Sequence, residues 1–264
     1  MPFPSQIAYQ SNYGCVSWEG HNAQNGEGLN AFLSGSVAAR LDDSTANEEM
    51  RGHLRGLGLT GMGQTALEEV LAAEEPEERD WAAGEALAEA VLEEHHDVVL
   101  PWNTERDKRN PFASLPGADV VGLQRDGASH RLAFGEVKCS SEAACPPQVM
   151  SGRSGGMGHQ IDALANDLGI ICQLLKWLLP RVKGTMYQEA FNQACERYFN
   201  TERRDVALFG VLVRDQTALE NDLRARGQSL GGQLRAPTIC CLIALYLPWP
   251  INQLPSAIRA GGAA

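Results

Sequence analysis

The pattern of apolar and polar residues predicts an α/β fold with a central mixed sheet flanked by helices. Apolar residues at helical spacing predict helices over 66–71 and 81–95. Strand patterns follow at 98–100, 118–123 and 131–138, and a tight turn at Asp126-Gly127 joins the last two into a hairpin. We then expect a helix over 159–179 that Pro180 ends, a helix with Tyr187 and Tyr198 on one stripe, a buried strand over 206–213, a helix over 217–226 and a last strand over 238–247.

The first 60 residues are rich in Gly, Asn and Ser, and we expect loops and short helices there. The predicted organisation is an N-terminal variable region over 1–64, packed on or preceding the core, and a second domain over 65–264. Residues Gly56–Gly61 match the G-x-G-x-x-G spacing of dinucleotide-binding loops. Residues 48–55 are too polar for the buried strand that such a loop follows, so a plain glycine loop is the favoured interpretation.

The charge of the chain is concentrated in one segment. Of the 264 residues 44% are apolar, and the formal net charge is −11. Residues 66–97 hold twelve acids and one base, which accounts for the whole surplus, and exposed helical faces explain most of these acids. An acidic chain argues against nonspecific coating of nucleic acid, which requires Lys and Arg to neutralise phosphates, but it allows local contact.

Cysteine and histidine positions give little sign of a soft metal site. The seven cysteines form no C-x-x-C pair and are odd in number, so neither a disulfide framework nor a zinc ribbon is predicted. His95 and His96 have no Cys or His at zinc spacing and are expected to act as cations at a helix C-terminus. With no secretory signal and no apolar run long enough to span a bilayer, we expect a cytoplasmic protein without membrane contact.

The predicted hairpin brings charged side chains together. A turn at Asp126-Gly127 would place Asp119 opposite Phe134, and strand alternation then puts Asp119, Glu136 and Lys138 on one face. The two carboxylates would be diagonal neighbours about 7 Å apart or less, where they repel unless a cation lies between them. Oxygen-only ligands suit Mg²⁺ or Mn²⁺, and Lys138 could stabilise negative charge or deprotonate a water.

Alternating charges on a strand are more often a solvated face or a surface ion pair. Here Glu136 lies within the apolar or small residues 132–137, and Asp119 lies between Ala118 and Val120. A charge embedded in such a strand needs a partner or a metal. This context favours the functional interpretation over the surface one.

These motifs resemble the PD-(D/E)XK nuclease superfamily over roughly Trp81–Leu247. Pro116-Gly117-Ala118-Asp119 stands at the Pro-Asp signature of the family, with two residues inserted, and Glu136-Val137-Lys138 stands at its Glu-X-Lys motif. The resemblance implies a restriction-endonuclease-like core. It further implies that Asp119, Glu136 and the Val137 carbonyl bind Mg²⁺ or Mn²⁺, while Lys138 acts on the attacking water.

Family members also use a glutamate from the first core helix and a glutamine from the helix after the hairpin. Glu85 stands at the first position, with Glu89 as the alternative one turn later, and Gln160 stands at the second. Leu164 occupies the position where one branch of the family has tyrosine. We expect Ser140 and Arg153 to contact nucleic acid.

The function implied by this resemblance is metal-dependent hydrolysis of phosphodiester bonds, with DNA as the expected substrate. The long N-terminal region and the strand end Phe134–Ser141 resemble nuclease subunits of Hachiman-type bacterial anti-phage defence systems, which implies a helicase partner. Two other classes stay open. One is a noncatalytic regulator that keeps the fold and binds nucleic acid or protein, and the other is a nucleotide-binding protein built on Gly56–Gly61.

Overall fold

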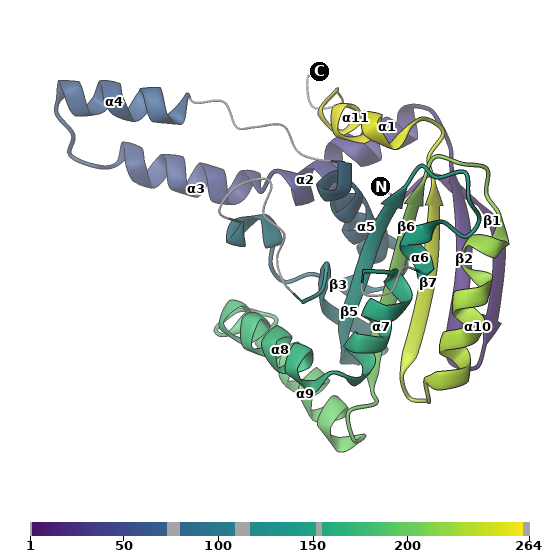
Figure 1. The fold of residues 1–264 in the computed structure, drawn as a ribbon. Helices are drawn as coiled ribbons and strands as arrows, with labels where there is room; N and C mark the ends of the chain where they lie inside the picture. The colour runs from purple at the N-terminus through teal and green to yellow at the C-terminus, as the bar shows by residue number, and fades with distance from the viewer. Residues whose placement is uncertain (1, 73–79, 109–116, 152–154, 261–264) are drawn as a thin grey trace.

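Helices cover both faces of one seven-stranded mixed sheet, so the protein has three layers (Figure 1). The computed structural model describes residues 2–72, 80–108, 117–151 and 155–260. The strand order across the sheet is β1-β2-β7-β6-β5-β4-β3. The strands are β1 (Ser5–Tyr13), β2 (Val16–Ala23), β3 (Val98–Val99), β4 (Val120–Asp126), β5 (Ser129–Ser140), β6 (Val206–Arg214) and β7 (Ile239–Tyr246).

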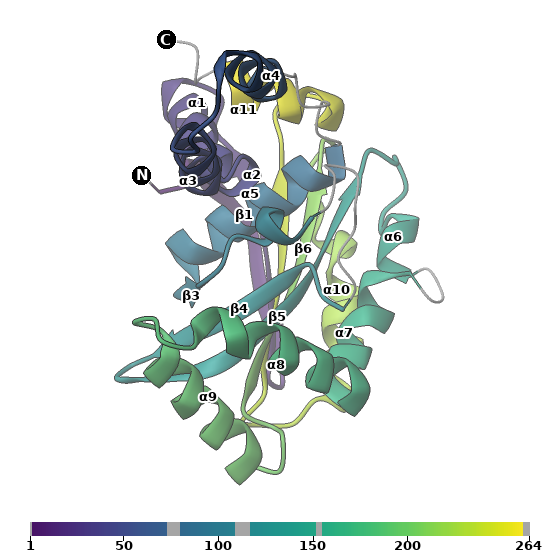
Figure 2. The ribbon, with the colours of Figure 1, turned by 90° about the vertical axis from the view of Figure 1, so that its left-hand side faces the viewer.

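Each face of the sheet has its own hydrophobic core and its own helices (Figure 2). The first face is covered by α1 (Glu27–Phe32), the π-helical η1 (Leu33–Val37), α2 (Ala38–Leu41), α5 (Asp80–His95) and α11 (Leu254–Ala260). The second face is covered by α6 (Gln148–Ser151), α7 (Met157–Asn166), α8 (Leu168–Val182), α9 (Gln188–Asn200) and α10 (Arg224–Gln233). No helix in the described part of the chain is both long and apolar enough to cross a membrane.

The centre of the sheet is parallel and its two edges are antiparallel. Strands β2, β7, β6 and β5 run in parallel. At one edge β1 pairs with β2 in antiparallel orientation, and at the other edge β4 pairs with β5 and β3 with β4, also in antiparallel orientation. Every residue of β6 is buried, because helices cover both of its faces, and its sequence is correspondingly apolar. The α/β fold class predicted from the sequence is confirmed.

Helix α5 packs unusually close to the sheet because its sequence is rich in small residues. A Cβ atom on Gly84 would overlap the Cys139 sulfur on β5, so the glycine lets the helix backbone approach the strand. The elements of the first face surround the helix, which explains why it is apolar nearly all round. The prediction that the acids of this segment lie on exposed helical faces is wrong for Glu89, which is buried at 4% exposure.

The prediction of loops and short helices at the N-terminus is wrong for residues 5–23, which form the β1–β2 hairpin. Strand β2 buries Val16 and Trp18 and pairs with β7 in the middle of the sheet. Strand β1 lies at the edge, where most of its side chains are exposed, so its sequence carries little apolar alternation. The N-terminal residues thus complete the central sheet, and the domain boundary at residue 64 stays a prediction.

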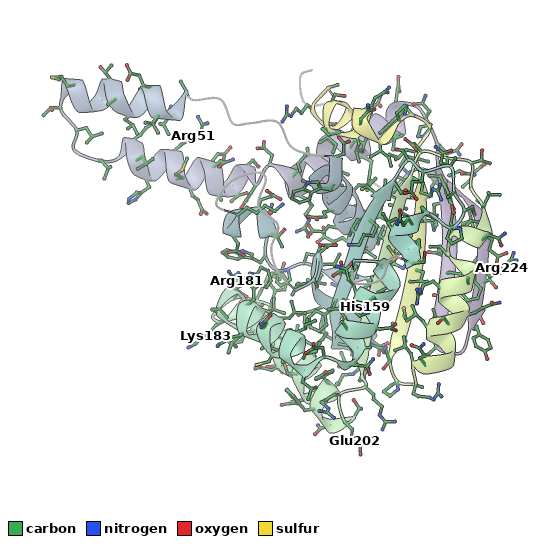
Figure 3. The ribbon with its side chains drawn as sticks, in the orientation of Figure 1. Arg51, His159, Arg181, Lys183, Glu202 and Arg224 are labelled. Carbon is green, nitrogen blue, oxygen red and sulfur yellow. The ribbon has the colours of Figure 1, made fainter. Side chains whose placement is uncertain are left out.

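Helices α3 (Ser44–Arg55) and α4 (Gly61–Leu71) form an arm that projects from the body (Figure 1). Side chains project from the arm on several sides, and Arg51 lies on α3 (Figure 3). The glycine loop Gly56–Gly61 joins these two helices. It follows a helix where a dinucleotide-binding loop would follow a strand, so the structure does not favour the nucleotide-binding alternative.

Two other predicted helices differ from the structure. The helix expected over 159–179 is divided into α7 and α8, because the Asp167 side chain caps α8 by accepting hydrogen bonds from the Gly169 and Ile170 amides. Pro180 lies inside α8, which continues to Val182. The helix expected over 217–226 is a 3₁₀ turn, η3 (Glu220–Asp222), followed by α10.

Candidate active site

The hairpin that carries the predicted site residues has a register two residues away from the expected one. Asp126 pairs with Ser129 and Val121 with Phe134, so the turn is Gly127-Ala128. Gly127 adopts a left-handed conformation with φ 60°, which suits the first central position of a tight turn. A shift of two residues preserves the side-chain alternation of the paired residues, and Asp119 lies one residue before the first pair, Val120 with Gly135.

Asp119 lies just before β4, and both its backbone and its side chain form hydrogen bonds with β5. Its amide donates to the Gly135 carbonyl at 3.0 Å, and its Oδ2 accepts the Val137 amide at 2.8 Å. The carboxylate therefore continues the pairing of β5 beyond the point where β4 begins. Since a strand residue directs its amide and carbonyl to the same edge, the Val137 carbonyl lies on the Asp119 side of β5.

Glu136 is buried beside Asp119, with one ammonium group next to both carboxyls. The Lys138 Nζ lies 3.2 Å from Glu136 Oε2 and 3.9 Å from Asp119 Oδ2. Glu136 is only 3% exposed. Burial first, and then the Asp119 charge and its hydrogen bond, raise the pKa of Glu136 to about 8, against the opposing effect of Lys138.

Helix α5 brings Glu85 toward this group from the opposite face of the sheet. Burial and then the charge of Asp119 raise the pKa of Glu85 to about 8, and Lys108 opposes this shift. For Glu89, the alternative one turn later, burial is the largest influence on the pKa, and the charges that follow are those of Arg40, Glu93, Glu105 and Lys108. Glu85 is therefore the helix glutamate that faces the site. We call Glu85, Asp119, Glu136 and Lys138 the carboxylate cluster.

Lys108 is a residue of this site that the sequence did not reveal. Its Nζ lies 3.9 Å from Glu85 Oε2 and 5.2 Å from the centre of the Trp81 ring, and its side chain is only 5% exposed. In the sequence it belongs to a basic cluster in a polar loop, and no local pattern relates that loop to α5. Only the packing of the loop against α5 places this second ammonium group beside the carboxylates.

Gln160 lies on α7, on the same face of the sheet as Glu136. Glu136 pairs with Gly210 on β6, and a Cβ on Gly210 would come within 2.7 Å of Ile161 and 2.8 Å of the Met157 sulfur. The glycine therefore lets α7 lie directly over the strand next to Glu136. The Gln160 Oε1 is buried and has no hydrogen-bond partner among the described residues, so it is free to accept one.

A cavity of about 490 Å³ lies at the carboxyl ends of β5 and β6, and no residue of the carboxylate cluster lines it. Ser140 lines it together with Trp81 and Asp215. The Ser140 hydroxyl is buried and accepts the Glu142 amide at 3.3 Å, a local contact that stabilises the strand end. Its role toward nucleic acid stays a prediction. Arg153 and Pro116 lie outside the described residues.

The histidine pair at the end of α5 does not behave as two cations at a helix terminus. His95 belongs to the last turn, and His96 follows it and turns toward the sheet, where its Nε2 lies 3.4 Å from Glu19 Oε1. Burial lowers the pKa of both histidines and so favours their neutral forms. The expected interaction with the helix dipole does not fit this arrangement.

The donor atoms of the carboxylate cluster are oxygens. Three carboxyls and one strand carbonyl are of the type that Mg²⁺ and Mn²⁺ prefer, but the three carboxyls do not form a group whose ligand atoms all lie within 4.8 Å of one another. Burial is the largest cause of the raised pKa of Glu85 and of Glu136, and Lys108 and Lys138 act against it. A bound divalent cation would favour the ionised carboxyls.

No protein-family model matches the sequence, and no curated protein matches it significantly. The fold and the site by themselves define an α/β protein with a partly buried carboxylate–lysine cluster at the point where the antiparallel β4 begins to pair with β5.

Proposed function

We propose that the protein is a metal-dependent nuclease that hydrolyses phosphodiester bonds in DNA, with the restriction-endonuclease-like core of the PD-(D/E)XK superfamily. The observation that carries this proposal is the buried Glu136 beside the half-buried Asp119, with the Lys138 ammonium 3.2 Å from a Glu136 oxygen and 3.9 Å from an Asp119 oxygen. Such a pair is unfavourable in an ordinary strand, because burial and mutual repulsion both oppose ionisation. It becomes favourable when a divalent cation is bound.

In this proposal Asp119, Glu136, Glu85 and the Val137 carbonyl hold Mg²⁺ or Mn²⁺. When bound, such an ion polarises a phosphate oxygen and lowers the pKa of a coordinated water. Lys138 would act in one of two ways: as an ammonium group it would stabilise the negative charge that develops on the phosphate, and as a neutral amine it would accept a proton from the attacking water. The free Gln160 Oε1 accepts a hydrogen bond from that water and fixes its direction of attack.

We further propose that the enzyme acts in the bacterial cytoplasm, in anti-phage defence, with a helicase as its partner. The net charge is −11, and the residues outside 66–97 hold as many acids as bases, so the sequence carries no overall excess of positive charge for DNA. A helicase that delivers the strand would supply the missing affinity. Ser140 and Arg153 would then make local contacts with the DNA beside the carboxylate cluster.

The test is DNA cleavage by the purified protein, alone and with any co-encoded helicase, on linear and circular DNA in Mg²⁺ or Mn²⁺. Wild-type protein should cut only with metal, and Glu136→Gln and Lys138→Ala should abolish cutting. Glu196→Gln, on the exposed side of α9, is the matched control and should cut normally. Because the Glu136 carboxyl favours its neutral form in the metal-free protein, the amide variant should keep the fold.

Undiminished cutting by Glu136→Gln would refute the assignment of the site. A protein that binds DNA or the helicase but never cuts in either metal would instead be a noncatalytic regulator that keeps this fold. Cleavage of RNA in preference to DNA would leave the site in place and correct the substrate.

A further inference from the structure

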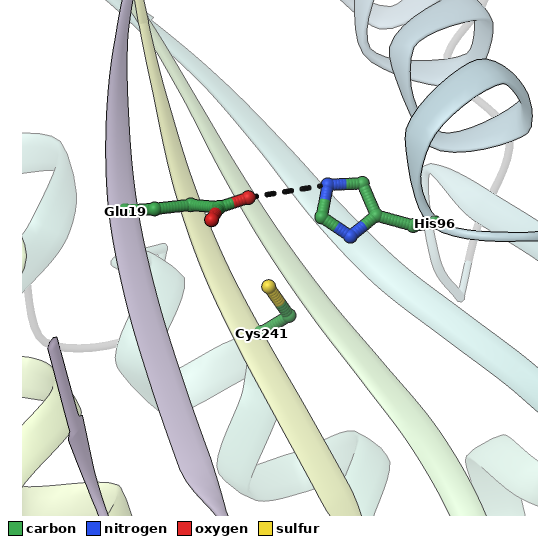
Figure 4. Close-up of side chains that lie close together, drawn as sticks. All are labelled: Glu19, His96 and Cys241. Atoms are coloured by element: carbon green, nitrogen blue, oxygen red, sulfur yellow. Dashed lines mark ion pairs between the residues drawn. The ribbon is translucent and has the colours of Figure 1, made fainter. Parts of the chain in front are cut away.

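A second group of ligand-type side chains lies on the first face of the sheet. Glu19 comes from β2, Cys241 from β7 and His96 from the residue after α5 (Figure 4). One carboxylate oxygen, one imidazole nitrogen and the thiol sulfur all lie within 4.8 Å of one another. We call these residues the Glu19–His96–Cys241 cluster.

The sheet register explains how two of these side chains meet. Strands β2 and β7 pair in parallel, with Ser17 beside Cys241 and Glu19 beside Ile243. Glu19 is therefore two residues further along than Ser17 and shares its face, which makes it a diagonal neighbour of Cys241. Figure 4 shows that His96 reaches across from the opposite side to close the group.

One distance in this group matches the ligand separation of a tetrahedral metal site. The His96 Nε2 lies 3.4 Å from Glu19 Oε1. Zinc bonds to nitrogen and oxygen of about 2.0–2.2 Å correspond to a ligand–ligand separation of roughly 3.3–3.5 Å in a tetrahedron. One sulfur, one nitrogen and one carboxylate oxygen form a donor set for Zn²⁺ or Co²⁺, whereas Mg²⁺ and Ca²⁺ require mostly oxygen.

Neighbouring groups hold each of the three side chains in place. The Ser17 side chain hydrogen-bonds the Cys241 sulfur, and the Gln10 amide donates to Glu19 Oε2 at 3.1 Å. The Gln124 amide donates to the His96 carbonyl at 3.1 Å, and the His96 ring packs against Phe209 with centroids 6.0 Å apart. Metal ligands in proteins are commonly oriented by such outer contacts.

A cavity of about 400 Å³ opens beside the cluster and gives an ion a route of entry. Its walls include Ser17, His96, Gln124, Phe209 and Cys241. A transition-metal site with three protein ligands leaves its fourth position for water or another small ligand. Here that position would face the cavity.

We propose that Glu19, His96 and Cys241 bind one Zn²⁺-class ion, separately from the carboxylate cluster. The Cys241 sulfur forms a bond to the ion and its proton passes to water, while the His96 Nε2 and a Glu19 oxygen contribute lone pairs. The bound ion ties the N-terminal hairpin, the end of α5 and the last strand together. This inference does not depend on the proposed nuclease activity.

His21 suggests a different explanation for the position of Glu19, namely hydrogen bonding without a metal. Its Nε2 lies 3.1 Å from the same Glu19 oxygen, and its Nδ1 lies 3.2 Å from the Ser5 hydroxyl. It is not part of the group that lies within 4.8 Å. If Glu19 is only a hydrogen-bond acceptor shared by two histidines, the cluster will not retain a metal.

The test uses the full chain, stripped with a chelator and then titrated with Co²⁺. A thiolate-to-cobalt absorption band should appear and saturate at one equivalent, and Zn²⁺ should abolish it by displacement. Cys241→Ser should eliminate the band, and His96→Gln should weaken cobalt binding by about tenfold or more. Cys195→Ser, a half-buried thiol on α9, is the matched control and should keep the band.

A second control variant and a spectroscopic measurement complete the test. Glu136→Gln should keep the band, which separates this site from the carboxylate cluster even if no DNA is ever cut. X-ray absorption of the zinc-loaded wild-type protein should show one sulfur and otherwise nitrogen or oxygen ligands, so the test does not depend on the folding of any variant. No band in the wild-type protein, a band that persists in Cys241→Ser, or a zinc shell without sulfur would each overturn the proposal.

Discussion

The carboxylate cluster and the Glu19–His96–Cys241 cluster differ in both chemistry and origin. The first contains only hard oxygen ligands and two nearby ammonium groups, and most of its residues lie on a single hairpin. The second mixes oxygen, nitrogen and sulfur, and each ligand comes from a distant part of the chain. The comparison shows how one sheet can present a local site and a non-local site of different metal preference.

Helix α5 is the element that the two clusters share. It carries Glu85 toward Asp119 at one end, and His96 follows its other end and faces Glu19. Its close packing on β5 through Gly84 sets the positions of both residues. A substitution at one end of this helix should therefore affect one cluster, whereas a substitution that shifts the whole helix should affect both.

The largest expected effect is loss of catalysis at the carboxylate cluster. Glu136→Gln should reduce metal-dependent DNA cleavage roughly 10³-fold, because it removes a charged metal ligand. The same variant should keep the thiolate-to-cobalt band. Gel-based cleavage assays and cobalt absorption on one protein preparation measure both, and loss of both signals together would show that the clusters are not independent.

The next effect concerns the contribution of Glu89 to the pH dependence of the unfolding free energy. Glu89 is buried on α5 but lies outside both clusters. Burial first raises the pKa of Glu89 to about 7 from an ordinary value of 4.5. The folded state then binds this proton more tightly, so its contribution to stability is complete below pH 4.5 and is lost as the pH rises through about 7.

Glu89→Gln should therefore gain on the order of 3 kcal/mol in unfolding free energy relative to wild type between pH 4.5 and pH 8. Urea unfolding of both proteins at these two pH values measures the difference. Glu69→Gln, which is exposed on α4, should change nothing. A Glu89→Gln curve parallel to the wild-type curve would mean that Glu89 is ionised in the folded protein.

A smaller effect is expected from Gly84→Ala. The added Cβ would overlap the Cys139 sulfur, and overpacking of this kind costs about 1–3 kcal/mol of stability. Adding Cys139→Ala should recover much of the lost stability, because it removes the sulfur atom that the new Cβ would overlap. Gly52→Ala on α3, where a Cβ meets nothing within 4 Å, should be neutral or slightly stabilising. Urea unfolding compares the variants, and a Gly84→Ala protein of wild-type stability would contradict the close packing of α5.

The smallest effect is predicted for Gln160→Leu. The buried Gln160 Oε1 has no partner among the described residues, so replacing it should change the unfolding free energy by no more than about 1 kcal/mol. Cleavage should nevertheless slow by about tenfold, the equivalent of one lost hydrogen bond to the attacking water. Unchanged cleavage together with raised stability would assign Gln160 to packing alone.

Much of the parallel core could be predicted because its strands are apolar along their whole length, as β6 is. The hairpin faces were predicted correctly although the register was two residues off, since alternation has a period of two. The β1–β2 hairpin was missed because an edge strand with an exposed face has a polar sequence. The break at Asp167 was missed because a capping aspartate looks like any other polar residue within a helical pattern.

The sequence by itself determined the α/β class and the shared face of Glu136 and Lys138, because strand alternation relates these two residues locally. Only the tertiary structure chose Glu85 over Glu89, brought Lys108 to the site and left the Gln160 oxygen without a partner among the described residues. It alone brought Glu19, His96 and Cys241 together. Contacts between distant segments depend on how helices and strands pack across the sheet, and no local spacing in the chain encodes that packing.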